Sequence, residues 1–393
     1  MPEPPREADL VVVGAGIVGL AAAREMALRH DGLRVVVLER EPCIASHQTG
    51  HSSGVIHGGI YYEPGSLKAR LCVAGARELY EYCEEHGIPA RRSGKLIVAT
   101  RESELERLAE LERRGRENAV PGLRRVNRAE IREIEPHARG LAALHSPATG
   151  VVDFARVARS VAHEVERLGG SVITGCHVEA IGEKGSAVTV RHSRGSTEAA
   201  SVVVCAGLGG DRLAVAAGDD PDPRIVPIRG RYLSLRTERA DLVRASIYPV
   251  PDPRLPFLGA HLTRGPEGAV TLGPSALITA QGGLAPTLGW PGTWRMMRRN
   301  WRAAAGEVRR AVSMAAFVAE GRLMVPELRT SDFTRGWSGV RAQAVARDGT
   351  LVDDFVVGRA GRAVYVRNAP SPAATASLAL ARLVADELEP LTA

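Results

Sequence analysis

The chain has few cysteines, and they lack the pattern of a disulfide framework. Its 393 residues include five, an odd number, and no two of them form a CxxC pair. They are Cys43, Cys72, Cys83, Cys176 and Cys205. Small secreted domains that depend on disulfides usually carry an even and denser set. We therefore expect reduced thiols in a cytoplasmic protein.

Long hydrophobic runs are also missing. The apolar run near the N-terminus, LVVVGAGIVGLAAA, covers residues 10–23, whereas a bilayer-spanning helix needs about 20 apolar residues. The preceding residues, MPEPPREAD, do not form the positively charged flank of a signal peptide. We expect neither export nor a transmembrane helix.

Positive charge is not gathered in one block. The formal net charge is +6, from 51 basic and 45 acidic residues, and the basic excess is spread through arginines. This distribution argues against a nucleic-acid partner and only weakly favours acidic substrates or cofactors.

A metal-binding motif is absent as well. His47 and His51 are four residues apart, but Gln48 stands where the HExxH motif carries glutamate, and Gly50 argues against a helix there. We expect no metal site.

What the sequence does contain is a dinucleotide-binding pattern. An apolar strand at 10–13 precedes GAGIVG, a helical run at 20–29 follows, and a second strand ends in Glu39. Gly14, Gly16 and Gly19 have the GxGxxG spacing, in which the glycines allow a tight turn, close approach of a pyrophosphate, and close packing of helix on strand. Glu39 lies where a carboxylate can accept hydrogen bonds from a ribose diol.

The residues that follow favour FAD over NAD. An NAD dehydrogenase should continue with further strands and helices, but this chain runs into HSSGVIHGGIYY, residues 51–62. Such small residues can lie extended along a large flat ligand. Near the C-terminus, NAPSPAATAS predicts a helix that begins around Ser371 and directs free N–H groups and a positive dipole end at the flavin. A simple N-cap at Ser371 is the alternative.

The order of elements predicts two domains of an α/β protein. We expect a discontinuous, Rossmann-like FAD-binding domain with an inserted α+β substrate domain that carries a mixed or antiparallel sheet. The first domain is predicted over residues 1–90, 140–220 and 327–393, and the second over 91–139 and 221–326. Between Pro221 and Pro326 prolines cluster and strand candidates are short, which marks the insertion. The charged run 102–117 has leucines at helical spacing and predicts a solvated helix.

Several long strings together resemble one family, the L-2-hydroxyglutarate oxidases and dehydrogenases, which are FAD enzymes of the glycine-oxidase and D-amino-acid-oxidase type. They are HQTGHSSGVIHGGIYYEPGSLKARLC, HSPATGVVDF, IVPIRGRYL, IYPVPDPRLPFLGAHLT, GVRAQAV, DGTLVDDF and VRNAPSPAATASLA. The resemblance implies oxidation of L-2-hydroxyglutarate to 2-oxoglutarate by hydride transfer to flavin N5. Electrons would then pass to oxygen, a dye or the membrane quinone pool.

The resemblance also implies the cofactor site. With neighbouring positions included, the predicted residues are Gly14, Gly16, Gly19, Glu39, Arg40, Thr49, Ser52, Ser53, Val178, Ala206, Gly207, Ser371, Pro372 and Ala373. Two departures stand out. Ser52 follows GH where the family pattern has asparagine, and TAQGGLAPTLGWPG lacks expected aromatic and charged residues, which bears on the substrate more than on the reaction type.

Oxidation of an alcohol needs a base for the hydroxyl proton. Histidine suits this role because its ordinary pKa of about 6.5 leaves it largely neutral at pH 7. The candidates are His57 and His261. His57 lies in the segment 51–62, which we place along the isoalloxazine of FAD, and His261 lies in an expected strand of the substrate domain. Each could instead be a structural histidine, and His57 could carry a covalent flavin link.

A dicarboxylate substrate needs two cationic anchors, because each carboxylate would otherwise be buried unpaired. Arg341 and Arg229 are the predicted anchors, with Tyr61, Tyr62 and Lys68 as further donors. The alternative for each arginine is a surface salt bridge.

Three further alternatives stay open. The protein could act on another 2-hydroxy acid or an amino acid. It could also be a non-catalytic flavin-binding subunit, although such a subunit would have no need of the candidate base histidines. The stretch WPGTWRMMRRNWR, residues 290–302, is either a packed helix with solvated arginines or a helix on the inner surface of the cell membrane. The second interpretation would bring a quinone within reach.

Overall fold

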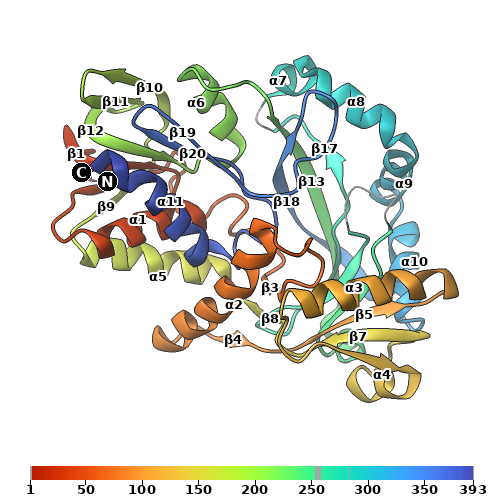
Figure 1. The fold of residues 1–393 in the computed structure, drawn as a ribbon. Coiled ribbons are helices and arrows are strands. Elements are labelled where there is room, and N and C mark those ends of the chain that lie inside the picture. The colour runs from red at the N-terminus through yellow and green to blue at the C-terminus, as the bar shows by residue number, and fades with distance from the viewer. Residues whose placement is uncertain (1, 253–257, 282, 393) are drawn as a thin grey trace.

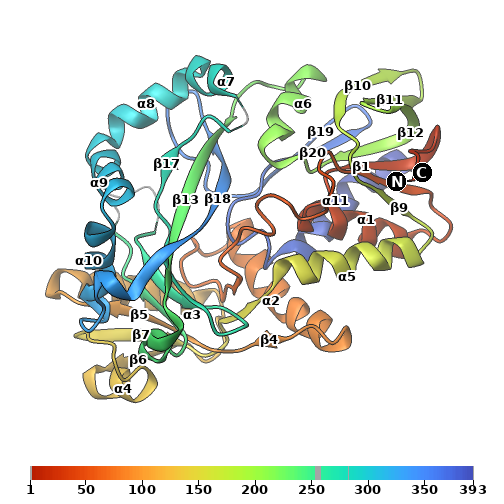
Figure 2. The ribbon, with the colours of Figure 1, turned by 180° about the vertical axis from the view of Figure 1, so that it is seen from behind.

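The computed structural model describes residues 2–252, 258–281 and 283–392. Two sheets form the body of the molecule, and the chain crosses between them several times (Figures 1 and 2). Both termini lie together beside the first sheet (Figure 1). Residues 253–257 of the proline-rich stretch and residue 282 of the TAQGGLAPTLGWPG stretch lie outside the described residues.

The first sheet has a parallel centre. Its order across the centre is β20-β12-β1-β2-β9, with every neighbouring pair parallel. These strands are β1 (Glu7–Val13), β2 (Val35–Leu38), β9 (Ser171–Ile173), β12 (Gly195–Val204) and β20 (Ala363–Asn368). They are rich in valine and buried almost throughout, as expected for a parallel sheet covered on both faces.

Antiparallel strands extend this sheet at one side. They are β10 (Val178–Lys184), β11 (Ala187–His192) and β19 (Val356–Ala360). One face is covered by helices whose small and branched side chains share one apolar core. The helices are α1 (Ile17–Arg29), α2 (Leu67–Glu85), α5 (Phe154–Arg167) and α11 (Ser377–Thr392). The short helix α6 (Gly210–Ala216) packs near β20 and β10.

The second sheet is mixed and mostly antiparallel. In the described part of the chain it has nine strands, in the order β17-β13-β16-β15-β14-β5-β7-β6, with β18 paired to β13. They are β5 (Lys95–Ala99), β6 (Arg124–Asn127), β7 (Ala142–Ser146), β13 (Arg224–Leu235), β14 (Ser246–Pro249), β15 (His261–Arg264), β16 (Val270–Gly273), β17 (Leu277–Ile278) and β18 (Phe333–Val345).

Helices flank the second sheet, and a small sheet joins the two halves. The helices are α3 (Leu105–Glu117), α4 (Arg128–Ile134), α7 (Leu284–Gly289), α8 (Pro291–Arg299), α9 (Trp301–Val312) and α10 (Met314–Met324). Helices α7 to α9 form the outer edge of this half (Figure 1). The joining sheet consists of β3 (Val55–Ile56), β4 (Ala90–Arg91) and β8 (Gly150–Val152).

Sheet membership differs from the predicted division at two places. Strand β7 begins after the predicted boundary at residue 140, and β18 lies after the boundary at 326, yet both belong to the second sheet. Both return to it through long-range antiparallel pairing, which local sequence does not reveal.

Candidate active site

A deep cavity of about 920 Å³ lies between the two sheets within the described structure. Its wall includes the turn after β1, the end of β2, the segment 45–57, the turn after β12, strand β18 and the loop 369–375. The volume is at the upper end of the range of roughly 300–1,000 Å³ typical of ligand and cofactor sites. The lining segments place the ends of the parallel strands at one end of the cavity and the second sheet at the other.

Glycines shape the turn between β1 and α1. Gly14 has φ +103°, and a Cβ there would lie 2.5 Å from the backbone oxygen of Cys205. A Cβ on Gly19 would lie 2.1 Å from the oxygen of Gly14. Close packing therefore requires glycine at both positions. At Gly16, on the cavity wall, the nearest atom to a Cβ would be Thr49 Oγ1 at 3.4 Å, which leaves the backbone open to a ligand.

The N-terminus of α1 meets this cavity. The Ile17 N–H donates to Thr49 Oγ1 at 3.1 Å, and the first turn of the helix contains no acidic residue. The positive end of the helix dipole and its free N–H groups are thus available to an anion such as a pyrophosphate.

Glu39 ends β2 at the same wall. Its carboxylate accepts hydrogen bonds from the Ala15 N–H at 2.8 Å and the Glu41 N–H at 3.0 Å. These bonds fix the carboxylate while leaving lone pairs for the hydroxyls of a ribose. The open backbone at Gly16, the helix N-terminus and this carboxylate match the phosphate and sugar groups of FAD.

The other predicted cofactor residues lie on the same wall. All fourteen line the cavity, namely Gly14, Gly16, Gly19, Glu39, Arg40, Thr49, Ser52, Ser53, Val178, Ala206, Gly207, Ser371, Pro372 and Ala373. They come from six separate stretches of the chain, and the fold brings them together.

The segment 51–62 crosses from the first domain to the second sheet. The His57 N–H donates to Thr375 Oγ1 at 3.1 Å, and Cys72 Sγ donates to the His57 carbonyl at 3.3 Å. Beyond it, Asn118 Nδ2 donates to the carbonyls of Gly59 and Tyr62, both at 2.9 Å. The segment is therefore held from three sides, by the C-terminal loop, α2 and the end of α3.

The C-terminal loop differs from the prediction in one respect. The expected helix start at Ser371 is wrong, because α11 begins at Ser377 and residues 371–376 form successive turns. The Ala373 N–H donates to the Pro370 carbonyl at 2.8 Å, and the Ala376 N–H to the Pro372 carbonyl at 2.9 Å. Pro370 and Pro372 disfavour helical backbone at the residues that precede them, Ala369 and Ser371, so the regular helix begins later. Ser371 instead lies with its Oγ 3.3 Å from His57 Nε2.

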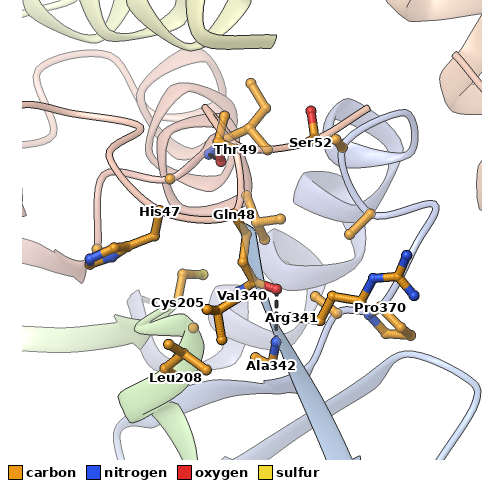
Figure 3. A pocket seen from close by; sticks show the side chains of 18 of the residues that line it. His47, Gln48, Thr49, Ser52, Cys205, Leu208, Val340, Arg341, Ala342 and Pro370 are labelled. Atoms are coloured by element: carbon orange, nitrogen blue, oxygen red, sulfur yellow. Dashed lines mark hydrogen bonds between the residues drawn. The ribbon is translucent and has the colours of Figure 1, made fainter. Parts of the chain in front are cut away.

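Strand β18 closes the cavity from the side of the second sheet. Gln48 Oε1 accepts a hydrogen bond from the Ala342 N–H at 3.0 Å, drawn as the dashed line in Figure 3. A Cβ on Gly339 would lie 2.6 Å from the His51 carbonyl oxygen, so strand and segment are in close contact. Val340 and Arg341 lie on the wall between these two contacts (Figure 3).

The predicted substrate residues gather at this end of the cavity. His57, Tyr61, Tyr62, Lys68 and Arg341 all line it. Lys68 is buried and its Nζ donates to Asp353 Oδ1 at 2.8 Å. The cavity thus combines a histidine, two phenols and two cations beside the cofactor wall.

His57 is held neutral by its surroundings. Its side chain reaches the cavity, but burial among protein atoms and the positive charges of Lys95, Lys68 and Arg341 lower its pKa well below the ordinary value. Its Nδ1 is buried without a hydrogen-bond partner in the part of the chain that the structure describes. A neutral imidazole has one nitrogen lone pair that can accept a proton from a ligand, and Nε2, 3.3 Å from Ser371 Oγ, is the nitrogen on the accessible side of the ring.

Two predicted residues do not reach the cavity wall. His261 stacks on Tyr248, with ring centroids 3.8 Å apart, and its Nδ1 lies 3.0 Å from the Gly259 carbonyl oxygen. Burial lowers the pKa of His261 to about 3. Arg229 lies on β13 but is not among the lining residues. Of the paired candidates, His57 and Arg341 therefore have direct access to a bound ligand.

Sequence reasoning missed two residues at this end. Tyr232 lines the cavity from β13. Burial raises the pKa of Tyr232, and Arg341 partly offsets this rise. Lys95, at the start of β5, lies behind Tyr61. One signal was available for the second, since the chain has 48 arginines but three lysines, Lys68, Lys95 and Lys184.

The described residues hold neither a metal-binding cluster nor a bilayer-spanning helix. No group of three or more His, Cys, Asp or Glu side chains in residues 2–252, 258–281 and 283–392 has the arrangement of a metal site. Among the same residues, no helix has both the length and the apolar character needed to cross a bilayer.

Comparison with known sequences covers almost the whole chain. The family profile described as "FAD dependent oxidoreductase" matches residues 9–387. Human mitochondrial L-2-hydroxyglutarate dehydrogenase is 44% identical over 409 residues, which cover 97% of this chain and 88% of the human protein. The L-2-hydroxyglutarate dehydrogenase of Indibacter alkaliphilus is 40% identical over 390 residues, 96% of this chain and 98% of that protein.

Solved structures share the fold at low identity. The FAD-bound L-alpha-glycerophosphate oxidase of Mycoplasma pneumoniae matches with a TM-score of 0.80 and 22% identity, over 98% of this chain and 95% of that one. Glycine oxidase of Geobacillus kaustophilus matches with a TM-score of 0.73 and 18% identity, again over 98% and 95%.

Proposed function

This chain belongs to the FAD dependent oxidoreductase family, and from that premise we propose that it oxidises L-2-hydroxyglutarate to 2-oxoglutarate. The observation that carries the proposal is the position of a neutral histidine, His57, on the wall of a cavity that joins a cofactor site to two cationic side chains. The name shared by the relatives supplies the substrate.

The reaction removes two electrons and two protons from the alcohol carbon and its hydroxyl. The C2–H bond breaks with its electron pair while the O–H proton leaves to a base. FAD, when bound, supplies the acceptor for the hydride. The protein's part is to hold the substrate, to accept the hydroxyl proton and to keep water out of the site.

His57 is the proposed base. Nδ1 is buried, whereas Nε2 lies 3.3 Å from Ser371 Oγ on the accessible side of the ring, so a neutral imidazole protonated on Nδ1 would present its Nε2 lone pair to the hydroxyl proton. His57 is fixed by the backbone bond to Thr375, so the imidazole is oriented before the substrate arrives. Such positioning contributes about 10²- to 10⁴-fold in rate.

Arg341 and Lys68 are the proposed carboxylate anchors, with Tyr61, Tyr62 and Tyr232 as hydroxyl donors. The Tyr61 hydroxyl is buried and without a hydrogen-bond partner among the described residues, so a ligand oxygen would satisfy it. Burial raises the pKa of Tyr61 and Tyr62 well above the ordinary value, which keeps both phenols protonated as donors. The proposed set suits a small dicarboxylate.

The substrate is tested by anaerobic mixing of the FAD-bound protein with a panel of L- and D-2-hydroxy acids and amino acids, followed through flavin absorbance. We expect bleaching by L-2-hydroxyglutarate. Bleaching by a different hydroxy acid or by an amino acid alone would assign the site to that substrate. No bleaching by any of them would favour a non-catalytic flavin protein.

We also propose that helices α7 to α9 contact a membrane surface. Large apolar side chains are exposed along them, including Trp294 at 55% and Trp301 at 60% of their full accessibility. Exposed arginines alternate with these residues, namely Arg295, Arg298, Arg299, Arg302 and Arg309. Indole rings suit the interface between headgroups and acyl chains, and each arginine near an anionic leaflet adds about 1 kcal/mol. This contact would favour a membrane quinone over oxygen as electron acceptor, while the predicted cytoplasmic location stays a prediction.

The double variant Trp294→Ser/Trp301→Ser is expected to lose at least about tenfold in binding to vesicles of phosphatidylcholine and phosphatidylglycerol, because two large apolar rings no longer enter the bilayer. Co-sedimentation measures the bound fraction, and added salt should reduce binding of the wild type. Leu28→Ser is the matched control, since Leu28 is also an exposed apolar residue but lies on α1. A wild-type protein that stays in the supernatant, or a double variant that binds as well as the control, would contradict the proposal.

A further inference from the structure

Lysine is almost absent from this chain, and two of its three copies lie at the active site. Positive charge elsewhere comes from 48 arginines. Lys68 lines the cavity and Lys95 lies directly behind Tyr61, while Lys184 ends β10 in the other half of the molecule. Unlike arginine, lysine presents a compact ammonium whose proton occupancy responds to burial. Its use at these two positions is therefore informative.

Lys95 is a buried cation that forms no ion pair with any carboxylate of the described residues. Its side chain is 2% exposed, and Nζ lies 4.1 Å from the ring centroid of Tyr248 and 5.2 Å from that of Tyr61. Across the described residues it makes no side-chain hydrogen bond and no ion pair. Lysine is rarely buried so fully unless it is paired, and burial lowers the pKa of Lys95 to about 7. Two aromatic faces offset only part of the cost.

The ammonium of Lys95 and the imidazole of His261 both lie against the Tyr248 ring, and the charge of Lys95 also acts on His57. His261 stacks on the Tyr248 ring at 3.8 Å with an interplanar angle of 16°. Because Lys95 and His261 both lie about 4 Å from that centroid, they occupy opposite faces of the ring. His57 is also affected, since the charge of Lys95 lowers its pKa more than Lys68 or Arg341 does. One buried charge thus acts on both imidazoles.

The other charged and titratable groups around this cluster are already compensated or neutral. Lys68 is paired with Asp353 at 2.8 Å, and Asp252 on the cavity wall is 3.8 Å from Arg107. Burial raises the pKa of the Cys72 thiol to about 12 and that of Tyr61 and Tyr248 as well, so these groups stay neutral. Arg341 faces the cluster from β18 and would be occupied by the substrate.

We propose that Lys95 is a positioning residue whose buried positive charge keeps His57 and His261 neutral while a dicarboxylate substrate is bound. The inference rests on the proposed function. Anionic carboxylates beside an imidazole favour its protonated form, and a protonated His57 could not accept the hydroxyl proton. Arg341 and Lys68 are neutralised by carboxylates, whereas Lys95, screened from the ligand by Tyr61, keeps its charge at pH values below its pKa of about 7. Lys95 would therefore keep His57 able to accept a proton while the negatively charged substrate is bound beside it.

The test compares Lys95→Met with Lys184→Met, the same substitution at the lysine that ends β10. Histidine Cε1–Hε1 resonances of the ¹³C-histidine-labelled, FAD-bound protein are titrated by NMR, with His57→Gln and His261→Gln for assignment. Removal of the cation should raise the pKa of both imidazoles, by about one pH unit or tenfold in proton affinity. Lys184→Met should leave both titrations unchanged, and Lys95→Arg should restore the wild-type behaviour in part.

A second readout is the pH profile of flavin reduction at saturating substrate. Because a raised imidazole pKa protonates the base at higher pH, the acid limb of Lys95→Met should move to higher pH by a similar amount. Above the raised pKa of His57 in Lys95→Met, the imidazole is neutral in both proteins, so the two rates should converge. If Lys95→Met does not bind FAD, Lys95→Gln gives the same neutral comparison.

Unmoved histidine titrations with an unmoved acid limb would overturn the proposal. An equal fall in rate at every pH would also overturn it, because that result indicates a purely structural role. The NMR titration needs no turnover, so a failure of L-2-hydroxyglutarate to reduce the flavin would count against the proposed function and leave the test of Lys95 intact.

Discussion

Replacement of His57 by alanine is expected to slow the anaerobic reduction of the flavin by L-2-hydroxyglutarate about 10²- to 10⁴-fold, the range typical for loss of a positioned base. The imidazole lies on the cavity wall, with Nε2 3.3 Å from Ser371 Oγ. Alanine leaves the hydroxyl proton without an acceptor at that position. Stopped-flow absorbance of the flavin at saturating substrate measures the rate.

Two controls separate this effect from loss of the cofactor. The variant should bind FAD as the wild type does, since the glycine turn, the N-terminus of α1 and Glu39 are unchanged. His163→Ala, at an exposed position on α5, should be reduced at the wild-type rate. An FAD-loaded His57→Ala protein that is reduced as fast as the wild type would remove His57 from the mechanism and make His261→Ala the variant to measure.

Arg341→Met is expected to weaken substrate binding by about 1.5–3 kcal/mol, or roughly 10- to 150-fold, because a carboxylate loses a charge-assisted hydrogen bond. Arg341 lies on the cavity wall, and methionine keeps much of its length without its charge. The dependence of the reduction rate on substrate concentration gives the dissociation constant, and the limiting rate should change much less.

Arg229→Met provides the comparison on the neighbouring strand. In the antiparallel pairing of β13 and β18, Arg341 lies opposite Ile228, and Arg229 lies opposite Val340. Adjacent residues of a strand point to opposite faces of the sheet, so Arg229 points away from Arg341. We expect its loss to weaken binding far less. Equal effects of the two substitutions, or a larger effect of Arg229→Met, would contradict the assignment of Arg341 as the anchor.

Local sequence predicted the cofactor half of the molecule well. The family, the α/β fold and the FAD cofactor are confirmed by the family match and by the shared fold of the FAD-bound oxidase. The reason is that the strand, the GxGxxG turn and the helix are contiguous, so one short stretch of sequence determines their geometry. Close contacts at Gly14 and Gly19 explain why these positions are glycine.

The substrate half was harder to predict from the sequence, because strands that are far apart in the chain pair to form it. Whether Arg229 or Arg341 faces the cavity depends on the register of β13 against β18, which no local pattern reveals. Lys95 begins the apolar strand KLIVA, and it becomes a buried charge only because β5 pairs with β14 and brings Tyr248 beside it. The start of α11 was predicted too early, at Ser371, because residues 371–376 form turns whose sequence resembles that of a helix N-terminus.

The most direct test of the proposed function is a single anaerobic turnover with the two enantiomers of 2-hydroxyglutarate. The FAD-bound protein is mixed with each in the absence of oxygen, flavin absorbance is followed, and 2-oxoglutarate is quantified. We predict that the L-enantiomer bleaches the flavin and yields 2-oxoglutarate in an amount equal to the flavin reduced, while the D-enantiomer does neither. A flavin that stays oxidised with L-2-hydroxyglutarate but is bleached by another acid would contradict the account.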